Sequence, residues 1–202
     1  MSSVRTLTLA DVALPRTGVL RDILVVVGAS LVTAAAARIV LPLPWSPVPL
    51  TGQTFAVLLT GAALGARRGL LAQALYLVEG AMGLPFFAGG LGGPLVLAGP
   101  TGGFLLAFPL AAAVTGLCAE RGWDRRFGST LAAMLLGSAV ILVSGLALLS
   151  RFVPADRLLA AGLLPFVPGD VVKAVAAALA LPAAWRFVHG HPSRDRRGRL
   201  GA

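Results

Sequence analysis

Asp170 and Lys173 combine the residue types and the spacing that could hold a small polar ligand. Lys173 is the only lysine among the 202 residues, and it follows Asp170 by three positions in an apolar stretch. We expect this helix to start near Pro168, because proline favours the first helical position, which puts Asp170 in the first turn and Lys173 about 5 Å deeper. Side chains spaced i, i+3 share one helix face. Charge inside a membrane segment is costly and usually marks a substrate or ion path.

A structural role is the alternative for this pair. A carboxylate near a helix N-terminus complements the helix dipole, and a lysine can extend its charge to the membrane interface. These roles explain each residue alone. They do not explain why the only lysine lies three residues from the only acid of its segment, so we expect both side chains to contact a ligand.

Five further residues are candidates for the same binding site. Gly99 and Thr101 open an apolar segment, where a glycine lets the backbone approach a ligand and a helix start offers free N–H groups. Gln53 can donate and accept hydrogen bonds, although its run Thr-Gly-Gln-Thr also suits a helix cap. Tyr76 and Phe86 could pack on a ring-shaped ligand, whereas aromatic residues at a membrane boundary are most often interface anchors.

The composition is that of an integral membrane protein. Hydrophobic residues make up 57% of the chain and charged residues 12%, and the mean hydropathy is +0.87. Soluble domains carry about 45–50% apolar and about 25% charged residues. At about 20 residues per span, the length allows an all-α protein with six transmembrane helices. The apolar segments cover residues 22–41, 50–66, 69–84, 100–119, 128–151 and 168–188.

The arginines predict how these segments cross the membrane. Both tails and the connections 66–69 and 120–127 are rich in arginine, whereas the remaining connections carry little basic charge. The positive-inside rule places the arginine-rich parts in the cytoplasm, so both termini are expected there. Arg38, and the pair Arg151 and Arg157, run against this pattern. The predicted division is a cytoplasmic tail of residues 1–21, a six-helix membrane domain of residues 22–188 and a basic cytoplasmic tail of residues 189–202.

Two connections on the predicted outer side are long and rich in proline and glycine. They cover residues 42–52 and 83–103, and neither can be a regular helix throughout. Both stay mostly apolar. Irregular backbone is tolerated near a membrane where it is buried in protein or lines a cavity. We expect the two connections to form a lid and a pocket wall, with ordinary loop packing as the alternative.

Small residues recur at i, i+4 spacing in the first apolar segment, which allows another helix to approach closely. One interpretation is a docking face for another membrane subunit, and the other is packing within the bundle. The residues concerned are Ala29, Ser30, Thr33, Ala34 and Ala37.

Missing motifs disfavour several function classes. The single cysteine, Cys118, excludes an internal disulfide and a cysteine metal cluster. Both histidines, His189 and His191, lie in the tail, so no apolar segment offers one for metal or serine-protease chemistry. No phosphate-binding glycine loop for ATP is present. Because these motifs are missing, we do not expect an enzyme. We do not expect a nucleic-acid-binding protein either, because the basic residues behind the net charge of +9 are distributed as the membrane topology predicts. A stand-alone secondary transporter or channel that uses Asp170 as an ion or proton site is the alternative function.

Five motifs in order give this chain a family resemblance. They are Pro-Leu-Pro-Trp-Ser-Pro-Val-Pro-Leu-Thr-Gly-Gln-Thr (42–54), Leu-Leu-Thr-Gly-Ala-Ala-Leu-Gly (58–65), Tyr-Leu-Val-Glu-Gly-Ala-Met-Gly-Leu-Pro-Phe-Phe-Ala-Gly-Gly (76–90), Gly-Pro-Thr-Gly-Gly-Phe (99–104) and Pro-Gly-Asp-Val-Val-Lys (168–173). Together they resemble the biotin-specific substrate-binding subunit, or S component, of energy-coupling-factor (ECF) transporters.

The resemblance implies a multi-pass subunit of a prokaryotic plasma membrane that captures biotin from outside. It implies a transmembrane coupling subunit and ATPase subunits as partners, which bind the ATP, and no cofactor in this chain. Asp170 and Lys173 would contact the ligand, and the small residues of the first helix would face the coupling subunit.

Overall fold

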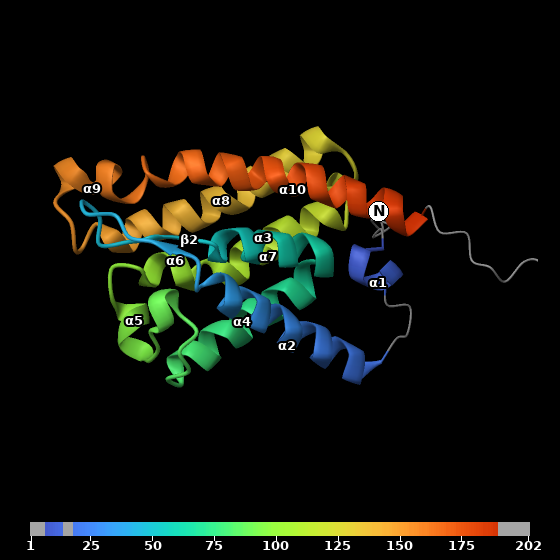
Figure 1. Ribbon diagram of the computed structural model, residues 1–202, viewed down its shortest axis with the longest axis horizontal. Coiled ribbons are helices and arrows are strands. Elements are labelled where there is room, and N and C mark those ends of the chain that lie inside the picture. Colours follow the sequence, from blue (N-terminus) through green and yellow to red (C-terminus); the bar gives the residue numbers. More distant parts are fainter. Residues whose placement is uncertain (1–6, 14–17, 190–202) are drawn as a thin grey trace, which may run out of the picture.

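Helices dominate the structure, a computed structural model that describes residues 7–13 and 18–189 (Figure 1). The longer helices are α2 (Val19–Ala36), α3 (Gln53–Leu64), α4 (Ala66–Ala81), α7 (Phe108–Ala119), α8 (Phe127–Leu149) and α10 (Phe166–His189). The shorter elements are α1 (Leu9–Ala13), η1 (Ala88–Gly90), α5 (Pro94–Ala98), α6 (Gly102–Leu106), η2 (Trp123–Arg125), α9 (Ala155–Gly162) and the strands β1 (Val40–Leu41) and β2 (Leu50–Thr51).

Each predicted apolar segment contains a helix, but two of the predicted boundaries were wrong. The fourth segment is split into α6 and α7 at Ala107, because Pro109 occupies the first turn of α7 and favours a new helix start. The last helix begins at Phe166 rather than near Pro168, so Asp170 lies beyond its first turn. The predicted N-terminal tail also contains helix: α1 and the first turn of α2 fall within it, whereas residues 190–202 of the predicted basic tail lie outside the described residues.

Four helical stretches of the described chain are long and apolar enough to cross a membrane. They are Val19–Ala36, Gly102–Ala119, Phe127–Leu149 and Ala155–Val188. The helices α3, with 12 residues, and α4, with 16 residues, are shorter than the roughly 20 residues of a perpendicular span. Many large apolar side chains point outward, among them Leu95 at 83% exposure and Val143 at 69%. Such an apolar surface suits a lipid environment, since soluble monomers rarely expose patches of this kind.

The α7 helix lies at the centre of the bundle, and 72% of the stretch Gly102–Ala119 is buried. Glycines bring its neighbours unusually close. A Cβ added at Gly61 of α3 would lie 2.4 Å from the Ala112 carbonyl oxygen of α7, and one added at Gly69 of α4 would lie 2.9 Å from the Gly61 Cα. The helices α3, α4 and α7 are therefore packed backbone against backbone, which only glycine permits.

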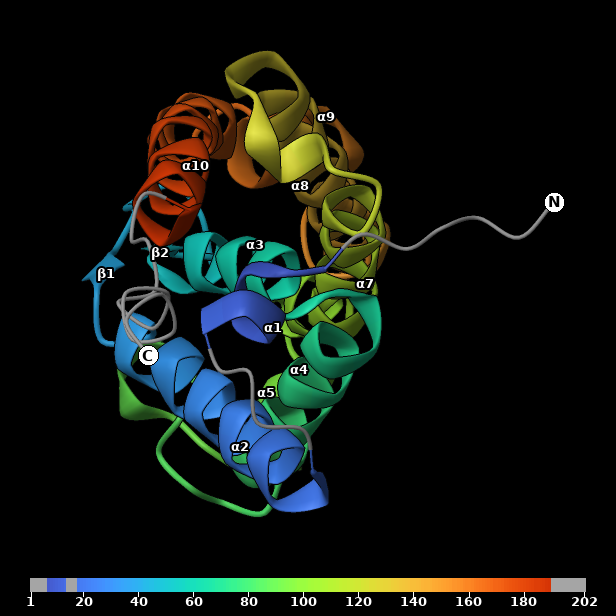
Figure 2. The same cartoon turned by 90° about the vertical axis from the view of Figure 1, so that its right-hand side faces the viewer.

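The arginine-rich connections and α1 gather at one end of the bundle, where α10 also ends (Figure 1). Seen from this end, α1 lies in the middle of a ring of helices (Figure 2). Asp11 of α1 accepts a hydrogen bond from Arg68 of α4 at 2.6 Å, and Arg68 also pairs with Asp22 of α2 at 2.9 Å. These ion pairs fix α1 across the end of the bundle.

A buried carboxyl lies at this same end. Asp124 of η2 is 2% exposed, and its Oδ2 accepts a hydrogen bond from the Trp185 indole of α10 at 2.5 Å. The Arg125 guanidinium stacks 4.5 Å above the Trp185 ring. The connection between α7 and α8 is thereby tied to α10.

The small residues of α2, and Ala37 directly after it, are buried inside the subunit. Ser30, Thr33 and Ala37 are fully buried, and Ala29 and Ala34 are each 7% exposed. The α2 helix packs on α4 and α3, and the Thr33 hydroxyl accepts a hydrogen bond from Gln73 of α4 at 3.0 Å. The alternative interpretation, packing within the bundle, matches this placement.

Candidate substrate-binding site

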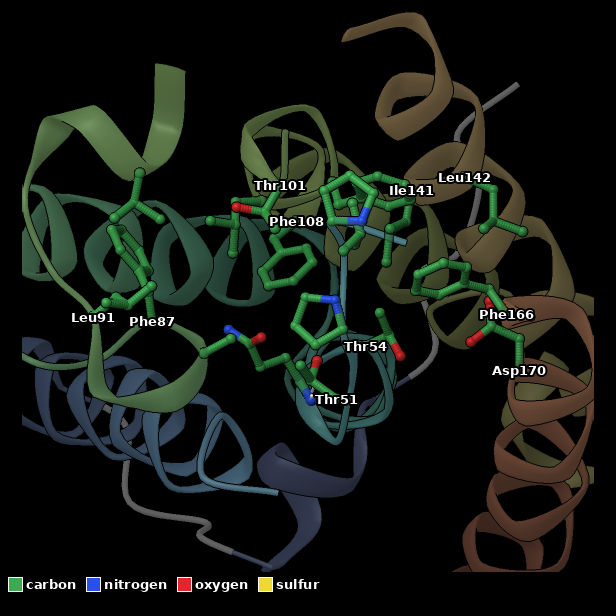
Figure 3. A pocket seen from close by; sticks show the side chains of 18 of the residues that line it. Thr51, Thr54, Phe87, Leu91, Thr101, Phe108, Ile141, Leu142, Phe166 and Asp170 are labelled. Carbon is green, nitrogen blue, oxygen red and sulfur yellow. Dashed lines mark hydrogen bonds between the residues drawn. The ribbon is translucent and has the colours of Figure 1, made fainter. Parts of the chain in front are cut away.

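A cavity of about 150 Å³ lies at the other end of the bundle, between α3, α6, α7, α8 and α10 (Figure 3). The two long connections also contribute to its wall, through residues 47–49 and 87–91. Its lining residues are Pro47, Val48, Pro49, Thr51, Gln53, Thr54, Phe87, Ala88, Leu91, Val96, Thr101, Phe104, Leu105, Phe108, Ile141, Leu142, Phe166, Asp170 and Lys173. The volume is below the roughly 300–1,000 Å³ of typical ligand pockets, so a ligand would have to push part of this wall outward.

Asp170 and Lys173 both line the cavity, from one face of α10. Asp170 is 6% exposed, and its Oδ1 lies 3.6 Å from the Lys173 Nζ. The Lys173 ammonium donates to the Thr51 carbonyl oxygen at 2.9 Å and to the Thr54 hydroxyl at 2.7 Å. Lys173 therefore links α10 to the start of α3, and the charged pair is held in place by groups of the protein on both sides.

Aromatic rings form much of the apolar wall. Phe104 of α6 and Phe166 of α10 stack with their centroids 5.5 Å apart and an angle of 23° between their planes. Phe108 of α7 and Phe87 of the long connection line other parts of the wall (Figure 3). Flat apolar surfaces of this kind suit a ligand with rings and few polar groups.

Tyr76 lies behind this wall rather than on it. It is fully buried, and its hydroxyl accepts a hydrogen bond from the Gln53 amide and donates one to the Phe86 carbonyl oxygen at 2.9 Å. Its ring packs against Phe87, with the centroids 5.7 Å apart, and against Phe108, with the centroids 6.2 Å apart. Tyr76 thus supports three residues that do line the cavity.

Four of the seven residues predicted for the site lie together in the cavity wall, namely Asp170, Lys173, Thr101 and Gln53. Tyr76, Phe86 and Gly99 do not line it. The aromatic residue that lines the cavity in this connection is Phe87, which is fully buried, and not its neighbour Phe86.

The sequence analysis did not single out Thr54 or the aromatic residues of the wall. Thr54 directly follows Gln53, so the same polar run at the start of α3 contained a signal for it. Phe104 ends the motif 99–104 and Phe166 lies two residues before the motif 168–173, but the two are far apart in sequence, and only the fold brings their rings together.

The cavity therefore offers an apolar enclosure with one charged pair and several hydroxyl and amide groups. That combination selects a small amphipathic molecule. Among the described residues, no group of three or more histidine, cysteine, aspartate or glutamate side chains could hold a metal ion.

Comparison with known proteins places the chain in a family. Its sequence matches the BioY family over residues 5–190. It is 44% identical to the biotin transporter BioY of Thermotoga maritima over 138 residues, which cover 68% of this chain and 80% of that protein. It is 43% identical to the probable biotin transporter BioY of Pyrococcus horikoshii over 133 residues, which cover 66% of this chain and 78% of that protein.

A solved structure has the same fold. It is the S component for biotin from an ECF-type ABC transporter, with a TM-score of 0.74 and 23% sequence identity over 83% of this chain and 92% of that one. The family match covers nearly the whole described chain, and the fold agrees with it. This chain belongs to the BioY family.

Proposed function

We propose that this protein captures biotin at the outer face of a prokaryotic cell membrane, as the substrate-specific subunit of an ECF transporter. The observation that carries the proposal is the Asp170–Lys173 pair in the wall of a largely apolar cavity with aromatic rings. Membership of the BioY family and the names of the relatives support biotin as the ligand.

The chemistry of biotin fits this cavity. Its ureido ring offers N–H donors and a carbonyl acceptor, its thioether ring is apolar, and its valerate tail ends in a carboxylate. Asp170 would accept from the ureido N–H groups, and Lys173 would interact with the carboxylate or the ureido carbonyl. The rings of Phe104 and Phe166 would pack on the apolar part of the ligand.

The proposed topology has six spans with both termini in the cytoplasm. The short helices α3 and α4 would complete the set, since the connection between them carries Arg67 and Arg68 and lies at the same end as α1. In this orientation the cavity faces outward, and the connections 42–52 and 83–103 form a lid over it.

The energy for uptake would come from partner subunits, namely a transmembrane coupling subunit and ATPases. The sequence itself has no phosphate-binding glycine loop. The earlier alternative, an independent channel or secondary transporter that uses Asp170 as an ion site, is not favoured, because the family consists of biotin transporters and Asp170 is paired with Lys173.

Equilibrium binding to the purified protein tests the ligand. Isothermal titration with biotin, thiamine and riboflavin should give saturable binding of biotin only, at one site per chain. Binding of another vitamin in preference to biotin, by protein that elutes as a single monodisperse peak, would contradict the proposal.

A further inference from the structure

A second hollow lies beside the biotin cavity, at the same end of the molecule. Its volume is about 660 Å³, and it opens between the first long connection and α9. The residues around it are Pro44, Trp45, Ser46, Pro47, Arg157, Ala160 and Ala161. We use the name outer groove for this hollow.

A thin partition separates the outer groove from the cavity. Pro47 lines both spaces, and Val48 next to it lines the cavity and is 4% exposed. Ser46 fastens this partition to α9, because its hydroxyl donates to the Ala161 carbonyl oxygen at 2.7 Å and accepts from the Val48 amide at 3.1 Å. One side-chain hydrogen bond to α9 and the burial of Val48 in the core thus hold the segment that would have to move for a ligand to pass from the groove to the cavity.

The groove carries the chemistry to hold an anionic molecule with rings. Arg157 of α9 is exposed, and its guanidinium can form two parallel hydrogen bonds to a carboxylate. Trp45 on the facing connection is 65% exposed and offers a flat indole surface. The neighbouring acid, Asp156, does not line the groove, so the charge presented there is positive.

The position of Arg157 adds to the argument. In the proposed topology it lies on the outer side, where the positive-inside rule disfavours arginine. Membrane orientation therefore does not account for this arginine, which lies beside an exposed tryptophan at a groove that shares Pro47 with the cavity.

We propose that the outer groove is an encounter site, where Arg157 and Trp45 first hold the ligand by its carboxylate and its apolar part before it passes the Ser46–Val48 partition. The ligand class is a small carboxylate with an apolar ring system. This inference rests on the proposed function, since biotin is the carboxylate in question. It assigns Arg157 to the rate of capture rather than to the strength of final binding.

Association and dissociation rates, measured separately with radiolabelled biotin, test this assignment. Arg157→Gln should lower the association rate constant by about three- to tenfold at low ionic strength, because charge steering raises association rates by one or more orders of magnitude. Dissociation, measured by a chase with unlabelled biotin, should slow by the same factor, so that the equilibrium dissociation constant stays within about twofold of wild type, since the groove no longer touches the bound ligand and this constant is the ratio of the two rate constants. The defect should shrink at 1 M salt, where the Debye length is about 3 Å.

Matched variants and a matched ligand give the controls. Biotin amide, which lacks the charge, should associate with wild type and Arg157→Gln at the same rate. Arg157→Lys should keep most of the salt-dependent association. Arg151→Gln removes another outer arginine, which is exposed and does not line the groove, and should leave the rate unchanged.

The outcomes separate the two proposals. If wild type binds no biotin at equilibrium, the proposed function falls. If wild type binds biotin but Arg157→Gln associates as fast as wild type, or Arg151→Gln slows association equally, the encounter site is wrong, and Arg157 and Trp45 are interface anchors.

Discussion

At the scale of single residues, the hydrogen bonds of Lys173 suggest different tasks for the two charged side chains of the cavity. The ammonium has three donors. Two of them are directed to Thr51 and Thr54, and Asp170 lies 3.6 Å away. A ligand must displace one of these partners to bind Lys173. The carboxylate of Asp170 also interacts with the Ser138 and Thr54 hydroxyl groups, but its two oxygens have about four lone-pair sites and can still accept from a ligand. Asp170 is therefore the better candidate for a direct contact, and Lys173 also positions the start of α3.

Asp170→Asn and Lys173→Ala should each weaken biotin binding by about tenfold or more. A hydrogen-bonding group built for a ligand leaves a costly unpaired partner when it is removed, about 1–3 kcal/mol, and about 1.4 kcal/mol is a factor of ten in affinity. Isothermal titration on monodisperse protein measures the change, with Asp156→Asn as the control acid, which is exposed and away from the cavity. Wild-type affinity in both cavity variants would leave the pair with a structural role only.

Asp124 makes stability depend on pH. Burial raises the pKa of its carboxyl above the ordinary 3.8, and the Trp185 hydrogen bond and the Arg125 charge offset this only in part. The folded state therefore favours the protonated form. The resulting stabilisation is complete below about pH 3.8 and is lost as the pH rises through the raised pKa.

Asp124→Asn should remove this dependence. We expect the unfolding temperature of wild type to fall relative to that of the variant as the pH increases from about 4 to 7. Thermal unfolding in detergent at several pH values measures the difference between the two proteins. A constant difference between wild type and Asp124→Asn at every pH would show that burial does not raise the pKa of the Asp124 carboxyl.

At the scale of elements, α2 shows where sequence reasoning stops. The helix itself follows from its apolar run, and the small residues correctly indicate a close helix contact. Whether that contact lies inside the subunit or toward a partner depends on how α2 is rotated against α4, which periodicity alone does not determine. The rotation of α2 decides which of two neighbouring residues is buried: Ser30 is 0% exposed, whereas Leu31 is 49% exposed.

A bulky substitution on the buried face of α2 should lower the stability of the subunit, whereas one on the exposed face should not. Ser30→Leu forces extra atoms into a packed interface, which typically costs about 1–3 kcal/mol, so the isolated subunit should unfold at a lower temperature. Ala35→Leu lies on the exposed face and should be tolerated. Thermal unfolding and size-exclusion chromatography of each variant without any partner decide the point. Equal stability of both variants would mean that the Ser30 face is not packed within the subunit.

The same limit explains the other differences between expectation and structure. Apolar runs and punctuating Pro and Gly residues predicted the helices, and the Asp170–Lys173 spacing predicted a shared face in the cavity wall. The break at Ala107 was missed because apolar residues continue on both sides of Pro109. The choice of Phe86 over Phe87 was wrong for the cavity wall, since adjacent residues in a loop point in directions that only the folded backbone sets.

At the scale of the whole molecule, the distribution of arginine and the gathering of α1 and the basic connections at one end support a single orientation in the membrane. Cysteine labelling in intact cells tests it. Cys118 is buried, so introduced cysteines can be labelled selectively. A membrane-impermeant reagent should label Trp45→Cys from outside, and should label Arg121→Cys only after the cells are opened. Labelling of Arg121→Cys in intact cells would contradict this orientation.

The backbone contacts among α3, α4 and α7 restrict the route of release. With Gly61 against Ala112 and Gly69 against Gly61, the three helices touch backbone to backbone, which leaves no gap between them at these positions. A passage between them would separate these helices along their length and lose the dispersion contacts between them. Release through this part of the bundle would therefore require α3, α4 and α7 to separate, whereas release through the mouth of the cavity would leave them packed. Import then requires one of two movements. Either the whole subunit moves as one body, so that the opening of the cavity reaches the cytoplasmic side, or a partner subunit separates the helices.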